Sequence, residues 1–183
     1  NYLRSMKVGP KYTQSKVTRS CPLDKLEHPL VSVSYINAWA FCDFYGLVLP
    51  SEAQWEKAAR GTDGRLYPWG NQKTTDQLCN FKGNVRSTTQ VGAYPKGMSP
   101  YGLVDCAGNV WEWCADAWDS NWLETIEDGK TVNASNNRVD SYSLRGGYFS
   151  HLGRVVHSAY RYYGSPDRCD NFIGFRPSQD TSD

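Results

Sequence analysis

The stretch YGLVDCAGNVWEWCADAW, residues 101–118, decides the fold of this chain. A Gly-Asn pair at 108–109 predicts a tight turn. Trp111 and Trp113 follow this turn at once, and we expect both to pack in the hydrophobic core. Cys106 and Cys114 stand among apolar neighbours, so we expect them to pack there as small hydrophobic residues.

Two helices are predicted upstream of this stretch. Apolar residues follow helical spacing over residues 34–46, where Gly46 is a natural stop. Further along, Ser51 with Gln54 three positions later forms a capping box. That box predicts a second helix that runs to about Arg60 and ends at Gly61.

The rest of the chain predicts short strands and many loops. Val31 and Val33 alternate with serine, a pattern typical of a short strand. Helical periodicity vanishes after Gly61, and residues 61–147 carry many proline, glycine and asparagine residues between short apolar pieces. We therefore expect one α+β domain with the two helices near its N-terminal side.

Length and composition exclude several classes of protein. The chain has 183 residues, is 39% hydrophobic and 14% aromatic, and carries a net charge of +1. Its aromatic content excludes general disorder, and its balanced charge argues against nucleic-acid binding. No apolar run is long enough to span a membrane. The domain bounds we expect are 1–27 for an N-terminal arm, 28–178 for the domain and 179–183 for a tail.

Six cysteines are present, but none forms a CxxC pair, so a zinc ribbon is not expected. Their spacing leaves open whether any of them are paired in disulfides.

Three blocks of sequence occur in a fixed order. They are LPSEAQWEKAARG (49–61) with YPWGN (67–71), the stretch 101–118, and LRGG (144–147) with PD (166–167) and GFRP (174–177). Together they resemble the formylglycine-generating enzyme (sulfatase-modifying factor) superfamily, over about residues 28–177. The resemblance implies an α+β, C-type-lectin-like fold of the formylglycine-generating type. A fold does not settle a function, so the sites decide between the alternatives.

The oxidase chemistry that the resemblance implies needs two cysteines after the Gly-Gly pair. In that superfamily they bind copper, for which a thiolate is the suitable soft ligand. The nearest positions in this chain are His151 and roughly Val156, and neither supplies a thiolate. Cys169 stands alone, after the Pro-Asp pair. We therefore expect no catalytic residues, no enzymatic activity and no required cofactor.

The segment from Gly146 to Arg176 has an unusual composition. None of its 31 residues is Lys, Glu, Gln, Met or Trp, although these types make up 29 of residues 1–145. At that frequency of one in five, about six would occur in the segment. These five are the types that an AAY asparagine codon cannot reach when its adenines are replaced. Such a pattern is typical of a diversity-generating retroelement, which copies an adenine-rich template into a variable gene with errors at adenine.

The frame of residues 146–176 also resembles the variable region of retroelement-diversified proteins. The fixed points are the Arg-Gly-Gly, Arg154, Arg161, the Pro-Asp and the Gly-Phe-Arg, with Ser158-Ala159 between them. Many members have Ser-Trp after the Gly-Gly, where this chain has Tyr148-Phe149. A second reading is a strand-rich segment that simply disfavours Lys and Glu.

The residues between the fixed points have the composition of a binding surface. Tyr and Arg are favoured contact residues, because rigid amphipathic rings supply area at low entropic cost. The predicted ligand-binding residues are Tyr148, Phe149, Ser150, His151, Leu152, Val155, Tyr160, Tyr162, Tyr163, Gly164, Arg168, Asp170 and Phe172.

These observations predict a non-catalytic protein that recognises a variable protein or glycan ligand on a host or neighbouring cell surface. The resemblance implies a place on a virion, such as that of a phage or archaeal virus, or on a microbial cell surface. Two alternatives remain open at this point. One is an oxidase of the formylglycine-generating type, and the other is a fixed structural module of the same fold.

The resemblance also implies one calcium site. Asp105, Gly108, Val110 and Glu112 match the positions that bind a calcium ion in the superfamily, and hard oxygen ligands suit that ion. The other reading is that Asp105 caps the turn while an internal hydrogen bond holds Glu112.

Overall fold

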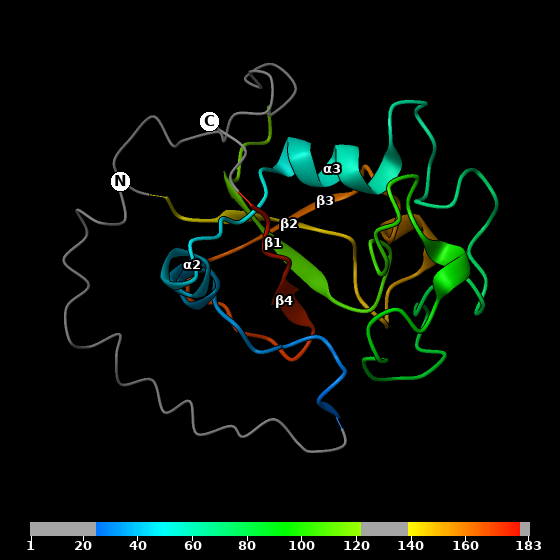
Figure 1. Cartoon of the computed structure of the whole chain (residues 1–183), viewed down its shortest axis with the longest axis horizontal. Coiled ribbons are helices and arrows are strands. Elements are labelled where there is room, and N and C mark those ends of the chain that lie inside the picture. Colours follow the sequence, from blue (N-terminus) through cyan, green and yellow to red (C-terminus); the bar gives the residue numbers. More distant parts are fainter. Residues whose placement is uncertain (1–24, 122–138, 180–183) are drawn as a thin grey trace.

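The computed structural model of this chain describes residues 25–121 and 139–179 (Figure 1). The predicted arm up to residue 24 and the predicted tail from residue 180 lie outside the described residues. Within the described ranges, no helix is both long and apolar enough to cross a membrane.

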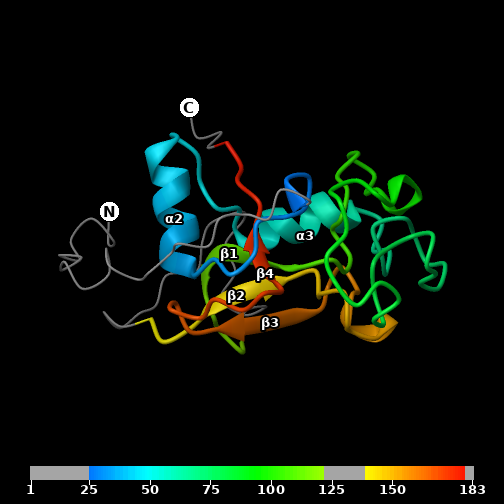
Figure 2. The same ribbon diagram turned by 90° about the horizontal axis from the view of Figure 1, so that it is seen from below.

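Two α-helices and one four-stranded sheet organise the described residues (Figures 1 and 2). Strand β1 pairs antiparallel with β2 and parallel with β4, and β2 pairs antiparallel with β3. The strand order is therefore β3-β2-β1-β4, with β3 at one edge. The elements are α2 (Tyr35–Phe44), α3 (Glu52–Arg60), η2 (Pro95–Gly97), β1 (Trp111–Ala117), β2 (Tyr142–Arg145), η3 (Gly153–Val155), β3 (Arg161–Gly164) and β4 (Ile173–Phe175).

Both predicted helices are confirmed, with the caps that the sequence indicates. Ser34 caps α2, where its side chain accepts a hydrogen bond from the backbone N–H of Asn37. The capping box of Ser51 and Gln54 is fully formed at the start of α3. Gly61 follows the last helical residue with a φ of +70°, a conformation that glycine adopts without strain.

The short strand predicted at Val31 and Val33 is wrong. Ser32 has a φ of +60°, which no strand accommodates, and its N–H donates to the carbonyl of Asp170 at 3.0 Å. The carbonyl of Val33 instead accepts a hydrogen bond from the indole of Trp113 at 2.9 Å. The segment is therefore a buried connection rather than a strand.

Separate apolar clusters join the two helices to the sheet. One cluster packs Tyr35 and Ala38 of α2 against Trp113, which is fully buried. A second packs Trp55 of α3 against Cys114. Successive residues of a strand point to opposite faces, so the consecutive positions 113 and 114 serve different clusters. As predicted from the sequence, Cys106 and Cys114 are buried, in the second cluster, and Cys42 is buried in the first.

Candidate functional site

Aromatic side chains from the 146–176 segment form one connected surface, here called the aromatic surface. It joins residues 148–151, residues 160–163 and Phe172, which are far apart in sequence. Its members are Tyr148, Phe149, His151, Tyr160, Tyr162, Tyr163 and Phe172. All were predicted as ligand-binding residues, and the fold brings them together.

Trp111 of β1 is the base on which this surface packs. It is 1% exposed, and its ring stacks with that of Tyr162 at 5.2 Å between centroids. The His151 ring meets it edge-on at 5.4 Å, and the Tyr160 ring lies 6.2 Å away. A buried, rigid ring therefore supports side chains that reach solvent above it.

A second part of the aromatic surface is centred on Tyr148. Its ring stacks on Phe172 at 4.3 Å and meets His151 at 4.1 Å. His151 thus contacts both Trp111 and Tyr148, and it links the two parts. Burial lowers the pKa of His151, so its ring is neutral near pH 7.

Most of the predicted ligand-binding residues reach solvent. Tyr163 is 48% exposed, Tyr160 39% and Tyr162 36%. Ser150 and Leu152 are also exposed, and Val155 is half-buried. Side chains placed in this way can contact a partner and can change without rebuilding the core.

A charged pair borders the aromatic surface. Arg168 lies with its guanidinium 5.6 Å from the centre of the Tyr162 ring and forms a 2.7 Å ion pair with Asp170. Both residues are half-buried. Arg168 therefore supplies a cation, and Asp170 a carboxylate, at the edge of the rings.

Gly164 is the exception among the predicted residues, because it lies outside the accessible surface. It is buried, and a Cβ atom there would lie 2.9 Å from Cη2 of Trp113 and 3.1 Å from Cδ of Arg168. A side chain at this position would therefore press into the core, and Gly164 offers no contact to a ligand.

A buried arginine holds the backbone beneath the aromatic surface. Arg145 of β2 is fully buried and donates to three consecutive carbonyls, those of residues 158, 159 and 160, at 2.9–3.4 Å. It also pairs with Glu52 at 3.4 Å and with Glu56 at 2.5 Å. These bonds fix the chain just before β3 through main-chain atoms, whatever side chains stand there.

Glu52 completes this buried network from the first turn of α3. Its carboxylate accepts from the side chain of Arg161 at 2.6 and 2.9 Å and from the hydroxyl of Ser143 at 2.9 Å. The guanidinium of Arg161 also lies 4.4 Å from the centre of the Trp118 ring. One helix residue thus ties β2 and β3 together.

A second ion pair anchors the far end of the 146–176 segment. Arg176 binds both oxygens of Glu112, at 2.8 and 3.0 Å, and donates to the carbonyl of Val104 at 2.9 Å. Trp55 donates its indole N–H to the same carboxylate at 2.7 Å. The Glu112 carboxylate raises the pKa of Arg176 and so favours the charged guanidinium.

These contacts bear on the predicted calcium residues. Trp55 and Arg176 occupy both oxygens of Glu112, and Asp105 accepts a 2.7 Å hydrogen bond from the N–H of Gly92. Burial raises the pKa of Asp105, and the Glu112 carboxylate adds to that rise. Glu112 is thus held by internal hydrogen bonds, as the alternative interpretation expects, whereas Asp105 bonds to the loop of Gly92 rather than to the turn at 108–109. Binding of calcium by Asp105, Gly108, Val110 and Glu112 stays a prediction that titration tests.

His151 and Val156, the residues nearest the cysteine positions that the resemblance implies, lie in the aromatic surface and in the core, respectively. Burial raises the pKa of the Cys79 and Cys106 thiols to about 12, and also raises those of Cys42 and Cys114. These thiols are protonated at neutral pH and are poor ligands for copper. Within the described ranges, no three His, Cys, Asp or Glu side chains are grouped to hold a metal.

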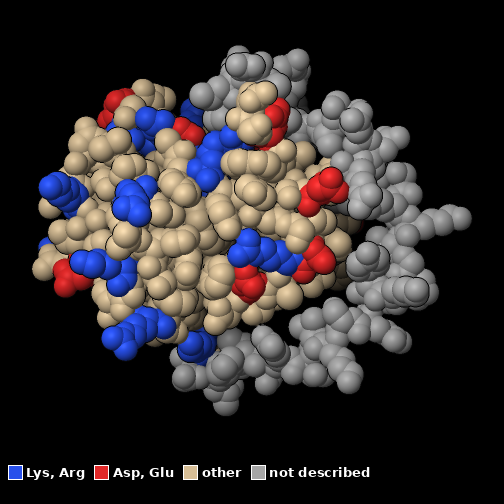
Figure 3. Space-filling view, turned by 180° about the vertical axis from the view of Figure 1, so that it is seen from behind, with Lys and Arg blue, Asp and Glu red and all other residues tan. Residues whose placement is uncertain are grey.

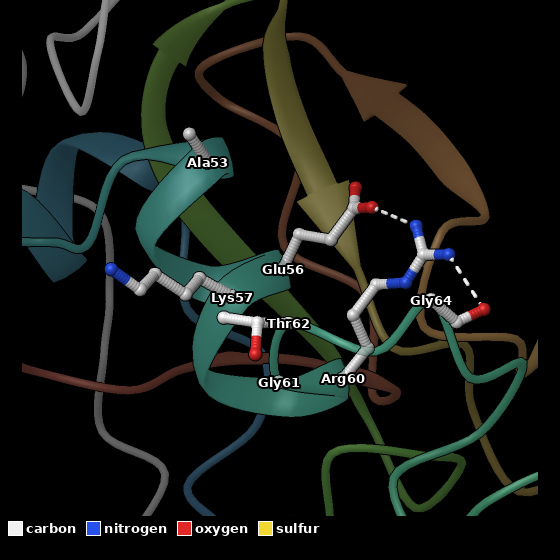
Figure 4. A pocket seen from close by; sticks show the side chains of 7 residues that line it. All are labelled: Ala53, Glu56, Lys57, Arg60, Gly61, Thr62 and Gly64. Atoms are coloured by element: carbon white, nitrogen blue, oxygen red, sulfur yellow. Dashed lines mark hydrogen bonds and ion pairs between the residues drawn. The ribbon is translucent and has the colours of Figure 1, made fainter.

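One shallow pocket lies elsewhere, along the C-terminal half of α3. Figure 4 shows Arg60 directed towards Glu56, with which it forms a 2.6 Å ion pair, and towards the carbonyl of Gly64. The residues that line this pocket are Ala53, Glu56, Lys57, Arg60, Gly61, Thr62 and Gly64. None of them belongs to the predicted site, and the aromatic surface remains the candidate.

Reasoning from sequence missed the residues that support the surface. Trp111 was expected in the core, but its role as the base of the aromatic surface depends on contacts with residues 40–60 positions away. Glu52 stands inside the capping motif of α3, where an acidic residue is common. Its partner Arg161 lies 109 positions further along the chain, so no local sequence pattern indicates this pairing.

Known proteins share both the sequence and the fold. A family model described as "Sulfatase-modifying factor enzyme 1-like domain" matches residues 6–181. The chain is 35% identical over 177 residues to the "Formylglycine-generating enzyme" of Thermomonospora curvata, covering 86% of this chain and 57% of that protein. It is 33% identical over 164 residues to the "Inactive C-alpha-formylglycine-generating enzyme 2" of Bos taurus, covering 84% and 50%. The chain thus spans about half the length of the curated relatives it matches.

A solved structure shares the fold at low sequence identity. "Treponema denticola variable protein 1" superposes with a TM-score of 0.67 at 21% identity, covering 89% of this chain and 76% of that chain. At this identity the likeness concerns the fold alone. Together with the family match it confirms the predicted α+β, C-type-lectin-like fold.

Proposed function

The chain belongs to the family of sulfatase-modifying factor enzyme 1-like domains, and on that premise we propose that it is a non-catalytic, ligand-binding member. The aromatic surface binds the ligand, a protein or a glycan on a host or neighbouring cell. The positions between the fixed points of residues 148–172 are diversified by a retroelement through errors at adenine. The protein acts on the surface of a virion or of a microbial cell.

The observation that carries this proposal is the contrast between the surface and its support. The side chains above Trp111 reach solvent, whereas Arg145 and Glu52 beneath them are fully buried. Arg145 holds the chain through carbonyl oxygens, which every residue type provides. A surface held in this way can change its side chains while the fold stays the same.

The residue types of the segment support diversification. Lys, Glu, Gln, Met and Trp are absent from residues 146–176, and substitution of the adenines of an AAY codon reaches none of them. The residues that are buried in the segment, such as Val156 and Ser158, need not vary. The exposed positions carry the Tyr, Ser and Leu that such codons do reach.

The positions of the family's catalytic residues support the absence of oxidase activity. Neither His151 nor Val156 has a thiol, and the exposed Cys169 lies after the Pro-Asp pair. The family includes relatives named as an enzyme and as inactive, so membership is compatible with either. Copper binding measured on the purified chain tests the enzymatic alternative, and stoichiometric Cu(I) binding would support it.

Sequencing of the gene across its natural population tests the proposal, together with the DNA just downstream. We expect variation confined to codons 148–172, and an adenine-rich near-copy beside a reverse transcriptase gene. A uniform gene without such a copy would remove diversification and favour the fixed structural module.

A further inference from the structure

Basic residues border the aromatic surface on the side of η3. Arg154 lies within η3, and Lys82 and Arg86 lie on the loop of residues 81–86. Lys73 lies on the preceding loop, and all four side chains are exposed. We call Lys73, Lys82, Arg86 and Arg154 the basic rim.

Backbone contacts hold the loop 81–86 against the 146–176 segment. The N–H of Lys82 donates to the carbonyl of His151, and that of Gly83 to the carbonyl of Phe149, both at 2.7 Å. These acceptors belong to two residues of the aromatic surface. The loop is therefore fixed at the border of the proposed binding site.

The other two basic residues neighbour a second close contact in the sequence. A Cβ atom on Gly153 would lie only 2.5 Å from Oγ1 of Thr74, so the two backbones pass close together. Lys73 precedes Thr74 and Arg154 follows Gly153 in the sequence, which places both cations beside this contact. Figure 2 shows η3 at the same end of the molecule as these loops.

The charge of the basic rim is largely uncompensated nearby. Asp76 is the one acidic residue within residues 73–86, and residues 146–155 contain none. Among the described residues, none of the four cations takes part in a salt bridge. Figure 3 shows Lys and Arg recurring along the side of the molecule that carries these loops, whereas uncharged residues cover most of the middle.

We propose that the basic rim is a constant part of the ligand-binding surface, and that the ligands are proteins that present acidic side chains to it. This inference rests on the proposed function. Lys73, Lys82 and Arg86 lie outside the diversified segment, and Arg154 belongs to its predicted fixed frame. Every variant of the surface therefore keeps these four cations, whatever its aromatic side chains are.

Electrostatics gives the basic rim and the aromatic surface different roles in binding. Exposed charges act over roughly 8–10 Å at physiological salt, so the basic rim attracts an acidic partner before contact. Such steering raises association rates about 10-fold or more. The aromatic surface then provides the close contacts that select among partners. Tyrosine and arginine are enriched where proteins bind proteins, which favours a protein over an anionic glycan.

The test uses the full chain and a short oligo-aspartate peptide as the acidic probe. We expect binding at low ionic strength that is lost as salt is raised. The double variant Lys82→Glu and Arg86→Glu should weaken it about 10-fold. The matched control, Lys57→Glu and Lys96→Glu, makes the same change in net charge at exposed sites away from the basic rim and should bind nearly as the parent does.

Further variants distinguish failure of the basic-rim proposal from failure of the proposed function. Tyr160→Ser with Tyr163→Ser should remove binding of a protein ligand selected on the parent chain, whereas Lys82→Glu with Arg86→Glu should weaken binding of both that ligand and the peptide. Equal losses of peptide binding in the rim variant and in the matched control, with unchanged melting curves, would contradict the proposed role of the basic rim. Ligand binding by the aromatic surface would be unaffected by that result. Tighter binding of a hyaluronan oligosaccharide than of the peptide would also overturn the assignment to acidic proteins.

Discussion

The carboxylate of Glu52, in the first turn of α3, accepts hydrogen bonds from Arg161 of the edge strand β3 at 2.6 and 2.9 Å. The Glu52 side chain has no solvent exposure, and Arg161 is 18% exposed. A helix near the N-terminal side thus holds the strand that carries Tyr162 and Tyr163. The support of the aromatic surface thus comes from outside the 146–176 segment.

The variant Glu52→Gln tests this support. It removes the negative charge that faces Arg145 and Arg161, so Arg161 loses its ion pair with Glu52 and the fully buried Arg145 keeps only the carboxylate of Glu56. We expect a loss of about 3–5 kcal/mol in the free energy of unfolding, measured by urea denaturation. Asp63→Asn removes an exposed pair with Arg65 and should leave the midpoint almost unchanged. Equal, small effects of both variants would contradict the role of Glu52.

Gly164→Ala tests the boundary of the variable surface. The new Cβ atom would stand 2.9 Å from Trp113, whose ring is fully buried and has no room to move. We expect a destabilisation of about 1–3 kcal/mol from overpacking, measured by thermal unfolding. Ser165→Ala, at the exposed neighbouring position, serves as the control. An unchanged midpoint for Gly164→Ala would return this residue to the set of variable positions.

Stability should fall as the pH is lowered below about 6.5. Burial lowers the pKa of His151 and of His157 from that value, so the unfolded chain takes up protons before the folded chain does. Their contribution to stability is therefore complete above pH 6.5 and is lost as the pH falls through their folded values. Urea midpoints between pH 7 and pH 5 measure the slope. The double variant His151→Gln and His157→Gln should flatten it, and an unchanged slope would contradict this origin.

Calcium titration tests the four residues that the family resemblance indicates. Because Glu112 is bonded to Trp55 and Arg176, we expect calcium chloride to leave the melting temperature unchanged. A ligand that binds only the folded chain would raise it. A rise that disappears in Asp105→Asn would show that calcium is bound and that Arg176 gives way to it.

Local sequence signals predicted the helices well. Ser34, Ser51 and Gln54 act through contacts with residues three positions away, and such signals are readable from the sequence itself. The strand predicted at Val31 and Val33 failed for the opposite reason. The conformation of Ser32 depends on a bond to Asp170, a residue that no local pattern relates to it.

The sequence grouped the residues of the aromatic surface but did not give their geometry. The composition of residues 146–176, together with the resemblance of their fixed frame, singled them out as candidates. The burial of Gly164 depends on Trp113, which the sequence places 51 positions earlier. The position of the basic rim beside the site was equally unpredictable from the sequence, because a backbone hydrogen bond from Lys82 to His151 places Lys82 there.

The central claim is that side chains of the aromatic surface can change, and so change the ligand, while the fold is kept. Two variants are compared: a triple variant with Tyr160→Ser, Tyr162→Ser and Tyr163→Ser, and the single variant Trp111→Ala. For each, we would measure thermal unfolding and binding to a ligand selected on the parent chain. We expect the tyrosine substitutions to cost about 0.5 kcal/mol or less each and to abolish binding. Trp111→Ala should cost about 3–5 kcal/mol. A tyrosine variant that melts as low as Trp111→Ala, or that binds as the parent does, would contradict the account.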